Sequence, residues 1–399
     1  MFLNFKIKNF LSIKDENIID FSINESQKID NTSEKVLKSF VNKIGCIVGP
    51  NASGKTNILR AFVTFATFIE NSYDMKKIQI APHFFHRDEN TSFSCEFIEK
   101  DIQYQYSIVL NNMKIIQEKL RKLNSQTNRY NDVYSRDNLS VKTSNDIEIN
   151  SADLVRLSDN ITCFSFLKKL NYFKQKNIEI NSFAEILSNV ELFHFFGTAK
   201  PVILSMLEIA EQLDKDKDLI AKLSKELNNI DTGIDNIFVV ETKQKIEDDN
   251  NGLVSEKMAK VLGTVHKDNE KEAKIPIIDA SDGTQHYIDL FIKVNNILNR
   301  GGILIADEIE NSLHVDLVER ILNLFMKKET NPNNAQILFT THNPWFLQYL
   351  TKTQIFIVEK EHQNTEVFRL DDIKSVRNDE NYFMKYITGE YDGKPKIRG

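Results

Sequence analysis

Residues 49–56 constrain this chain more than any other stretch, because they satisfy the phosphate-loop pattern in full. They are Gly49, Pro50, Asn51, Ala52, Ser53, Gly54, Lys55 and Thr56. An apolar run at residues 44–48 is typical of a buried strand, and from Asn57 onward the periodicity is helical. In this context backbone N–H groups bind an anion, Lys55 neutralises the β- and γ-phosphates, and the Thr56 hydroxyl ligates magnesium. A Gly-rich turn that arises by chance seldom contains the Lys-Thr pair and also lies between a strand and a helix. The motif therefore predicts a nucleotide site.

The composition is that of a globular protein with a moderate negative charge. Of 399 residues 41% are hydrophobic, enough for a large core or two lobes, and the net charge is −6. Any contact with DNA or RNA therefore requires a local basic patch. The cysteines, Cys46, Cys95 and Cys163, lack the spacing of a metal site or a disulfide framework. Because the sequence also lacks a signal-peptide core and any run of about eighteen apolar residues, we expect a cytoplasmic protein without a membrane partner.

Alternating apolar and polar residues predict that the chain opens with strands. The alternation runs through residues 2–10 and 18–23, and a helix is expected from Thr56 to about Tyr73. Two further alternating runs predict a β-hairpin that turns near Lys100. These runs are residues 92–98 and 103–110.

Residues 120–150 are rich in Asn, Ser, Asp and Thr, which predicts hairpin and loop rather than core. Scattered basic residues make this segment the first place to look for a nucleic-acid contact, although a solvated face is the simpler interpretation. These residues are Arg121, Lys122, Arg129, Arg136 and Lys142. His83 and His86 have the spacing of metal ligands but no accompanying Cys or carboxylate cluster, which favours ordinary loop histidines.

A helical pattern extends from Ser151 to about Ile234, with breaks near Asn171 and Gly197. Part of it is an apolar stripe of about two heptads, which favours packing on the protein's own core over a long coiled-coil arm. The stripe consists of Ile220, Leu223, Leu227, Ile230 and Ile234. A short strand is expected at residues 237–240, before a polar, charge-rich stretch.

Two apolar strands in the second half end in residues suited to phosphate chemistry. Residues 301–306 lead into Asp307 and Glu308. A strand beside a phosphate loop delivers one carboxylate to magnesium and a second to the attacking water, so Asp307 takes the first role and Glu308 the second. Residues 335–340 lead to His342, at the strand end where α/β sheets bind ligands and within reach of a γ-phosphate. The alternatives are that the two acids follow the strand by chance and that His342 has a purely structural role.

A further segment, Ser281, Asp282, Gly283 and Thr284, precedes an amphipathic helix. Ser281 and Gly283 lie where a helix N-terminus offers hydroxyl and amide groups to a phosphate. A simple helix cap is the alternative interpretation.

Taken in order, these motifs resemble the ABC-type ATPase heads of the RecF, SMC and overcoming-lysogenization-defect superfamily. Residues 281–284 match the signature motif, and His342 matches the switch histidine. Residues 307–314, 354–358 and 389–395 are similar to a bacterial AAA-15/AAA-21 group often encoded in anti-phage and abortive-infection gene pairs. The resemblance implies an α/β fold: an ABC-type ATPase head with a mixed β-sheet, the phosphate loop, an antiparallel β subdomain and an inserted helical lobe.

The resemblance also implies three domains. Residues 1–150 would form ATPase lobe I with the phosphate loop and the antiparallel β subdomain, and residues 151–274 a helical insertion with connecting strands. Residues 275–399 would form ATPase lobe II with the signature, the Walker B acids and the switch histidine. The chain departs from the pattern in lacking a clear glutamine-loop residue, for which Gln79 is the candidate. Ala52 stands where many SMC heads carry glycine.

In such heads two copies face each other head to tail, so that the signature of one caps the ATP of the other. We therefore expect an ATP-gated homodimer, or a higher oligomer, with ATP and Mg²⁺ as cofactors. The resemblance assigns catalysis to Glu308 and His342, ATP binding to the phosphate loop and Asn57, and metal binding to Thr56 and Asp307.

The leading interpretation of function is the sensor ATPase of an anti-phage defence system. The residues after Glu308 are nearly all used by the head, so the nuclease or toxin effector is expected on a separate chain. Two alternatives stay open: a RecF-like DNA repair or recombination ATPase that acts directly on DNA, and a scaffold that binds ATP with little turnover.

Overall fold

The computed structural model describes residues 1–24, 33–37, 39–75, 80–144, 157–170, 178–193, 202–230, 232–247 and 254–391. Contacts divide the chain into two compact units. The first consists of residues 1–192, 297–308 and 322–399, and the second of residues 193–296 and 309–321. The predicted three-domain division stays a prediction.

The first unit contains a six-stranded sheet that carries the phosphate loop. Its strand order is β12-β16-β17-β6-β18-β19. The strands from β16 to β18 run parallel, and β19 is antiparallel to β18. Every residue of β6, β16 and β17 is buried, as expected of parallel strands covered on both faces. The strands are β6 (Ile44–Val48), β12 (Val190–Phe193), β16 (Ile303–Ala306), β17 (Gln336–Thr341), β18 (Ile355–Glu361) and β19 (Asn364–Arg369).

This strand order confirms the α/β fold and brings distant motifs to one edge. The predicted strand at residues 44–48 is β6, and the two predicted strands of the second half are β16 and β17. Because β16, β17 and β6 are parallel neighbours, their carboxyl ends meet at the same edge of the sheet. The residues that follow these three strands are therefore neighbours in space.

Helix α1 (Lys55–Asn71) packs its apolar face against an antiparallel sheet. The ring of Phe5, in β1, lies 4.8 Å from the ring of Phe62 and 5.1 Å from that of Phe65. Aromatic rings at such distances add to the stabilisation from burial. The phosphate-loop helix is thus fixed to the sheet on its apolar side.

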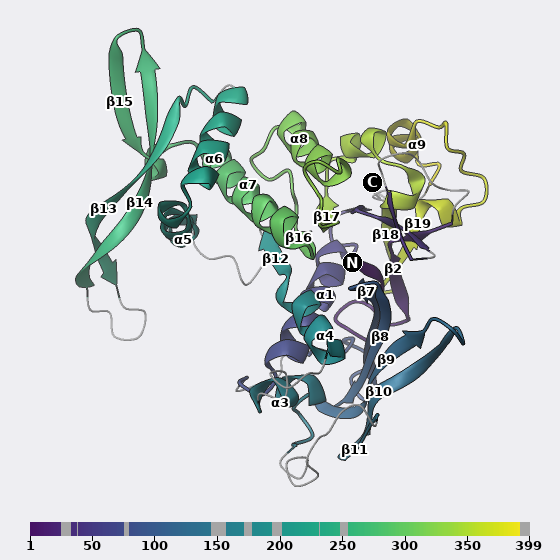
Figure 1. The fold of residues 1–399 in the computed structure, drawn as a ribbon. Coiled ribbons are helices and arrows are strands. Elements are labelled where there is room, and N and C mark those ends of the chain that lie inside the picture. Colours follow the sequence, from purple (N-terminus) through teal and green to yellow (C-terminus); the bar gives the residue numbers. More distant parts are fainter. Residues whose placement is uncertain are drawn as a thin grey trace. The chain divides into compact units, whose positions relative to one another are not determined.

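The antiparallel sheet has seven strands in the order β11-β10-β9-β8-β7-β1-β2. Figure 1 shows β7, β8, β9 and β10 side by side. The hairpin predicted near Lys100 is confirmed, since β7 and β8 are joined by Lys100 and Asp101. The strands are β1 (Phe2–Lys8), β2 (Asn17–Asp20), β7 (Thr91–Glu99), β8 (Ile102–Asn111), β9 (Lys114–Asn124), β10 (Arg129–Asp137) and β11 (Ser140–Thr143). A small sheet in the order β3-β5-β4 adds β3 (Ser22–Ile23), β4 (Ser33–Val36) and β5 (Ser39–Asn42).

The prediction of hairpin and loop for residues 120–150 is partly right, because β9–β10 and β10–β11 are hairpins, but the expectation that this segment avoids the core is wrong. Leu120 and Tyr134 are fully buried, and Arg136 is 1% exposed. The guanidinium of Arg136 donates hydrogen bonds to the carbonyl oxygens of Ser158 and Ile161. The polar composition misled because single residues of β9 and β10 are buried among mostly polar, more exposed neighbours, so the average polarity of the segment does not report their burial.

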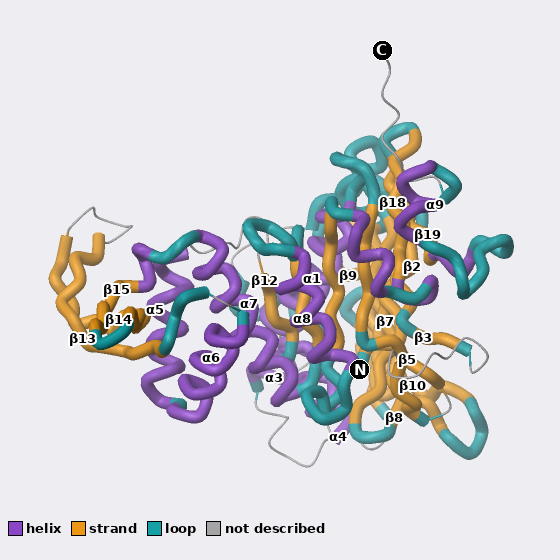
Figure 2. The backbone as a smooth tube through the Cα atoms, turned by 90° about the horizontal axis from the view of Figure 1, so that it is seen from above, coloured by secondary structure: helices purple, strands orange, loops and turns teal. Residues whose placement is uncertain are grey.

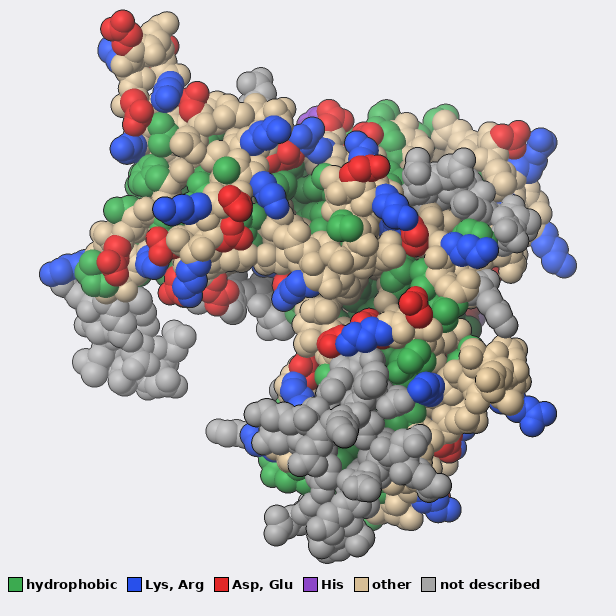
Figure 3. Space-filling view, in the orientation of Figure 1, with side chains coloured by type: hydrophobic (Ala, Val, Ile, Leu, Met, Phe, Trp, Pro, Cys, Tyr) green, Lys and Arg blue, Asp and Glu red, His purple; other side chains and the backbone are tan. Residues whose placement is uncertain are grey.

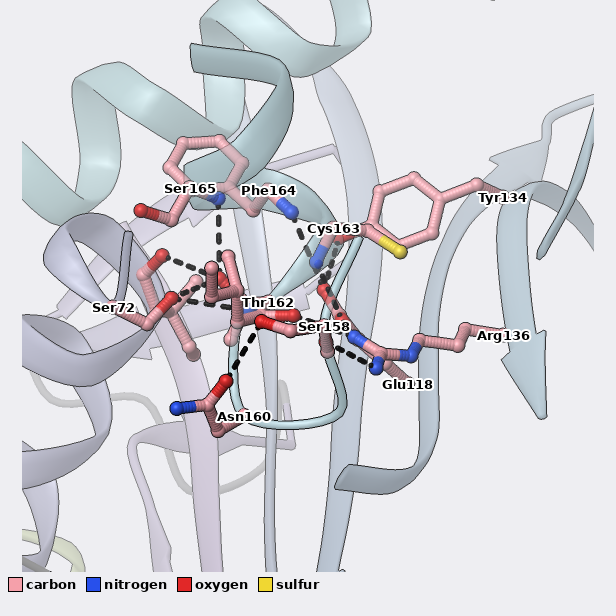
Figure 4. Close-up of polar contacts among 12 residues, drawn as sticks. Ser72, Glu118, Tyr134, Arg136, Ser158, Asn160, Thr162, Cys163, Phe164 and Ser165 are labelled. Carbon is pink, nitrogen blue, oxygen red and sulfur yellow. Dashed lines mark hydrogen bonds and ion pairs between the residues drawn. The ribbon is translucent and has the colours of Figure 1, made fainter. Parts of the chain in front are cut away.

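Arg136 belongs to a buried polar network centred on Glu118 (Figure 4). The Glu118 carboxylate is fully buried and accepts hydrogen bonds from the hydroxyls of Tyr106 at 3.0 Å and Tyr134 at 2.8 Å. It also accepts one from the backbone N–H of Cys163 at 2.8 Å. The network therefore ties β8, β9 and β10 to the start of α3 (Cys163–Lys169).

The helical pattern predicted after residue 151 is only partly right. Helices α3 and α4 (Ile178–Ser188) do occur, but Val190–Phe193 forms β12 at the edge of the six-stranded sheet. Four residues are too few for the alternation that would distinguish a strand from a helix end. The predicted breaks at Asn171 and Gly197 lie outside the described residues.

The second unit combines helices with a three-stranded antiparallel sheet in the order β13-β14-β15. Figure 2 shows α5 and α6 beside this sheet. Leu223 and Leu227 of the predicted stripe are buried in α6, which confirms packing within the protein itself. The elements are α5 (Val202–Lys215), α6 (Lys217–Asn229), β13 (Asn236–Glu247), β14 (Val254–Asp268), β15 (Lys271–Pro276) and α7 (Asp282–Arg300).

The strand predicted at residues 237–240 is confirmed but is much longer, and the charge-rich stretch after it forms β14 and β15. Helices α8 (Val315–Met326) and α9 (Tyr382–Thr388) complete the described fold. None of the helices in the described part of the chain combines the length and the apolar character that crossing a membrane requires.

Candidate functional site

The predicted phosphate loop lies between β6 and α1, and Lys55 is the first residue of a 17-residue helix. Gly54 has a φ of 108°, and a Cβ atom built on it would lie 2.1 Å from Oγ1 of Thr365. Only glycine combines this backbone conformation with so close an approach. The N-terminal end of the helix, with its positive dipole, faces this loop, an arrangement that suits an anion.

The Lys55 side chain is buried beside the loop carbonyls. Its Nζ donates to the carbonyl oxygens of Gly49 at 2.8 Å and Pro50 at 3.0 Å, and lies 3.3 Å from Nδ1 of His342. Because an ammonium group only donates hydrogen bonds, Nδ1 of His342 accepts and Nε2 carries the proton. That Nε2 donates to Oε1 of Glu308 at 3.1 Å. His342 thus connects the lysine predicted to neutralise the phosphates to the carboxylate predicted to orient water.

Asp307 and Thr56, the predicted metal ligands, lie next to each other. Oγ1 of Thr56 donates to Oδ1 of Asp307 at 3.2 Å, and the Asp307 side chain is nearly buried. A carboxylate beside a hydroxyl is the kind of oxygen donor pair that Mg²⁺ takes in nucleotide sites. The donor set therefore fits a magnesium ion.

Thr340, a buried residue of β17, holds both acids. Its hydroxyl donates to Oδ1 of Asp307 at 2.6 Å and accepts from the backbone N–H of Glu308 at 2.8 Å. Glu308 has a φ of 48°, a left-handed conformation that costs a non-glycine residue roughly 1–2 kcal/mol. Strain of this kind persists only where the surroundings enforce it. Thr340 is a positioning residue that the sequence analysis missed.

A chain of polar side chains braces the phosphate loop. Asn57 Nδ2 donates to Oγ of Ser12 at 2.7 Å, and Ser12 Oγ lies 2.7 Å from Oγ1 of Thr365. Oγ1 of Thr365 donates to the carbonyl oxygen of Ser53 at 2.8 Å. Asn57 takes part in this brace, and its predicted contact with ATP stays a prediction.

The loop also contains an unsatisfied polar group that suits a phosphate ligand. The Ser53 hydroxyl is buried and makes no hydrogen bond with any of the described residues. Leaving such a group unpaired costs about 1–3 kcal/mol, which a ligand oxygen in the loop would offset. Together with the lysine and the two metal-ligand candidates, Ser53 makes the loop fit a magnesium-bound nucleotide.

The signature residues belong to the second unit. Oγ of Ser281 accepts from the backbone N–H of Thr284 at 3.2 Å, so Ser281 caps α7, the alternative that the sequence left open. A Cβ atom on Gly283 would lie 2.7 Å from the carbonyl oxygen of Ser312, which explains glycine at this position. Ser281 and Asp282 are exposed, and their contact with a phosphate stays a prediction.

The two histidines that have the spacing of metal ligands lie in the loop before β7. His83 Nε2 donates to the carbonyl oxygen of Gln363, and His86 pairs with the Glu89 carboxylate, so both histidines have structural partners. Among the described residues, no group of three or more His, Cys, Asp or Glu side chains is arranged to hold a metal ion. The glutamine-loop candidate Gln79 lies outside the described residues.

The family described as "AAA domain, putative AbiEii toxin, Type IV TA system" (AAA_21) matches residues 44–347, more than half of the chain. The chain belongs to the AAA_21 family. This membership confirms the resemblance drawn from the motifs, and it makes the protein a nucleotide-binding ATPase domain by family. None of the curated proteins compared with this AAA_21 chain matches it.

Proposed function

We propose that this AAA_21 chain binds ATP with Mg²⁺ at the phosphate loop and hydrolyses it. The observation that carries the proposal is the contact of Thr56 with Asp307, beside the Lys55–His342–Glu308 chain of hydrogen bonds. When bound, Mg²⁺ supplies positive charge to the β- and γ-phosphates. Lys55 neutralises phosphate charge, and Glu308 orients the attacking water with His342 as its hydrogen-bond donor.

The proposal includes an ATP-gated homodimer. The signature segment, residues 281–284, of one copy would cap the ATP held by the phosphate loop of the other, as the family resemblance implies. Exposed Ser281 and Asp282 at the start of α7 support this role, because a helix N-terminus attracts a phosphate. ATP shared by two copies stabilises the dimer by mass action, and hydrolysis lets it relax.

We further propose that the protein is the sensor or regulatory ATPase subunit of an anti-phage system, and that the nuclease or toxin of this system is a separate protein. The family description, which names a toxin of a type IV toxin–antitoxin system, supports a two-component arrangement. A RecF-like role on DNA has less support, because Arg136 is buried and Arg121 pairs with Asp132. Figure 3 also shows acidic side chains interspersed with basic ones on the face it displays.

Two variants test the ATPase proposal. Lys55→Ala should lose nucleotide binding, because it removes the cation that faces the phosphates, and unchanged ATP affinity would refute the assignment. Glu308→Gln should keep ATP affinity, abolish turnover and accumulate the dimer in light scattering. Slow hydrolysis that Glu308→Gln leaves unchanged would favour a scaffold instead. Salt-sensitive DNA binding that stimulates turnover would favour the repair function.

A further inference from the structure

Three polar side chains of the second unit tie the helices α6, α7 and α8 together. Glu226 of α6 accepts a hydrogen bond from the hydroxyl of Tyr287, in α7, at 2.6 Å. Its carboxylate also pairs with the guanidinium of Arg320, in α8, through Nε to Oε1 and through Nη2 to Oε2 at 2.8 Å. A bidentate pair of this kind fixes the orientation of both groups. One carboxylate therefore bridges three helices.

Most of this bridge is out of contact with water. Tyr287 is 1% exposed and the Glu226 side chain 12%, whereas the Arg320 side chain is 43% exposed. Burial opposes the ionisation of Glu226, but the hydrogen bonds from Arg320 and Tyr287 outweigh it and hold the pKa of Glu226 below its ordinary value. Because hydrogen bonds to an ionised, poorly exposed group are worth more than an exposed ion pair, the bridge holds its helices firmly.

A second contact joins the start of α7 to the residues that lead into α8. A Cβ atom on Gly283 would lie 2.7 Å from the carbonyl oxygen of Ser312, so the two backbones touch. Ser312 has a left-handed φ of 60° and lies three residues before α8 begins. The signature segment is thus attached to the start of α8 directly through Gly283. It is attached to Arg320, further along α8, through Tyr287 and Glu226.

We infer that Glu226 is a positioning residue for the signature segment: by holding α7 to α8, it sets where Ser281 meets the ATP of the second copy. The inference rests on the proposed function, in which the signature of one copy caps the ATP of the other. Tyr287 follows Ser281 by six residues, about 9 Å along a helix axis, so the bridge acts on the cap through one rigid element. A misplacement of about 1 Å at such a distance can cost a large factor in rate.

Two variants weaken the bridge to different degrees. Glu226→Ala removes the carboxylate and should lower ATP turnover about tenfold, and Tyr287→Phe removes only one hydroxyl and should lower it about threefold. Asp214→Ala removes another ion pair of the second unit, the one between Asp214 of α5 and Lys260 of β14, and is the matched control with unchanged turnover. Urea unfolding shows that each variant is folded.

Mixtures of variants separate a misplaced signature from general damage. Lys55→Ala keeps an intact signature, so in an equal mixture it should cap the ATP site of Glu226→Ala and restore turnover to about one quarter of wild type. Ser281→Asp carries a negative charge in the signature and cannot cap that site. Its mixture with Glu226→Ala should therefore stay below about one tenth of wild-type turnover.

Several outcomes would overturn the inference. Turnover of Glu226→Ala within about twofold of wild type would do so. Equally low turnover in both mixtures would show that the whole copy is damaged and not its signature alone. If Glu226→Ala does not fold, Tyr287→Phe replaces it and should show a smaller difference in the same direction. A mixture of Lys55→Ala with Ser281→Asp that stays inactive would instead contradict the shared site of the proposed function, and the inference with it.

Discussion

Replacing Thr340 by valine removes one hydroxyl from the centre of the site and little else. Valine has nearly the shape of threonine, but it cannot donate to Asp307 or accept from the Glu308 N–H. The first hydrogen bond involves a carboxylate and is worth about 1.5–3 kcal/mol, and the second about 0.5–1.5 kcal/mol. Since Thr340 is fully buried, water does not replace either bond, and the expected destabilisation is about 2–4 kcal/mol.

The loss should also reach the chemistry. Without the Thr340 hydroxyl, the left-handed backbone of Glu308 loses the hydrogen bond that holds it. If about half of the lost stabilisation is also lost from the transition state, ATP turnover falls roughly tenfold. Urea unfolding measures the stability of Thr340→Val, and steady-state turnover at varied Mg²⁺ measures its activity. Thr340→Ser keeps the hydroxyl and is the control. Turnover within twofold of wild type in Thr340→Val would refute the positioning role.

Three further predictions concern the brace, the buried network and the cysteines. Thr365→Val removes the donor to the phosphate loop and should weaken ATP binding about fivefold in calorimetry, whereas Thr365→Ser should not. Glu118→Ala leaves the buried Arg136 without its carboxylate and should lower the free energy of unfolding by about 3–5 kcal/mol in urea, so a loss below about 1 kcal/mol would contradict the network. Burial raises the pKa of the Cys95 and Cys163 thiols, so a thiol reagent at pH 8 should label neither in the folded protein and all three cysteines once it unfolds. Because the unfolded thiols titrate near about pH 8.5, stability should fall as the pH rises above about 9.

The parts of the site that the sequence predicted are those with a local pattern. The phosphate loop needs glycine, lysine and a hydroxyl between a strand and a helix, and Asp307 and His342 each follow an apolar strand. Residues that are neighbours in the sequence stay neighbours in the folded protein, so a motif built from them can be recognised before folding is known. The parallel alignment of β6, β16 and β17 then brings the motifs together, as the known chemistry of phosphate loops leads one to expect.

The residues that hold the site in place escaped prediction because their partners are distant in the sequence. Thr365 braces Ser53 across 312 residues, and Thr340 reaches Asp307 across 33. A threonine near the end of a strand carries no local mark of such contacts. Arg136 was misplaced for a related reason, since its burial depends on carbonyl groups of a loop that follows the sheet.

The most direct test of a site shared by two copies mixes two inactive variants. Lys55→Ala lacks the ATP site but keeps the signature, and Ser281→Asp keeps the α7 cap but places a negative charge against the phosphate. Each alone should be inactive. An equal mixture should recover about one quarter of wild-type turnover, since half of the dimers are mixed and each contains one complete site. An inactive mixture, or full activity of Ser281→Asp alone, would contradict the shared site.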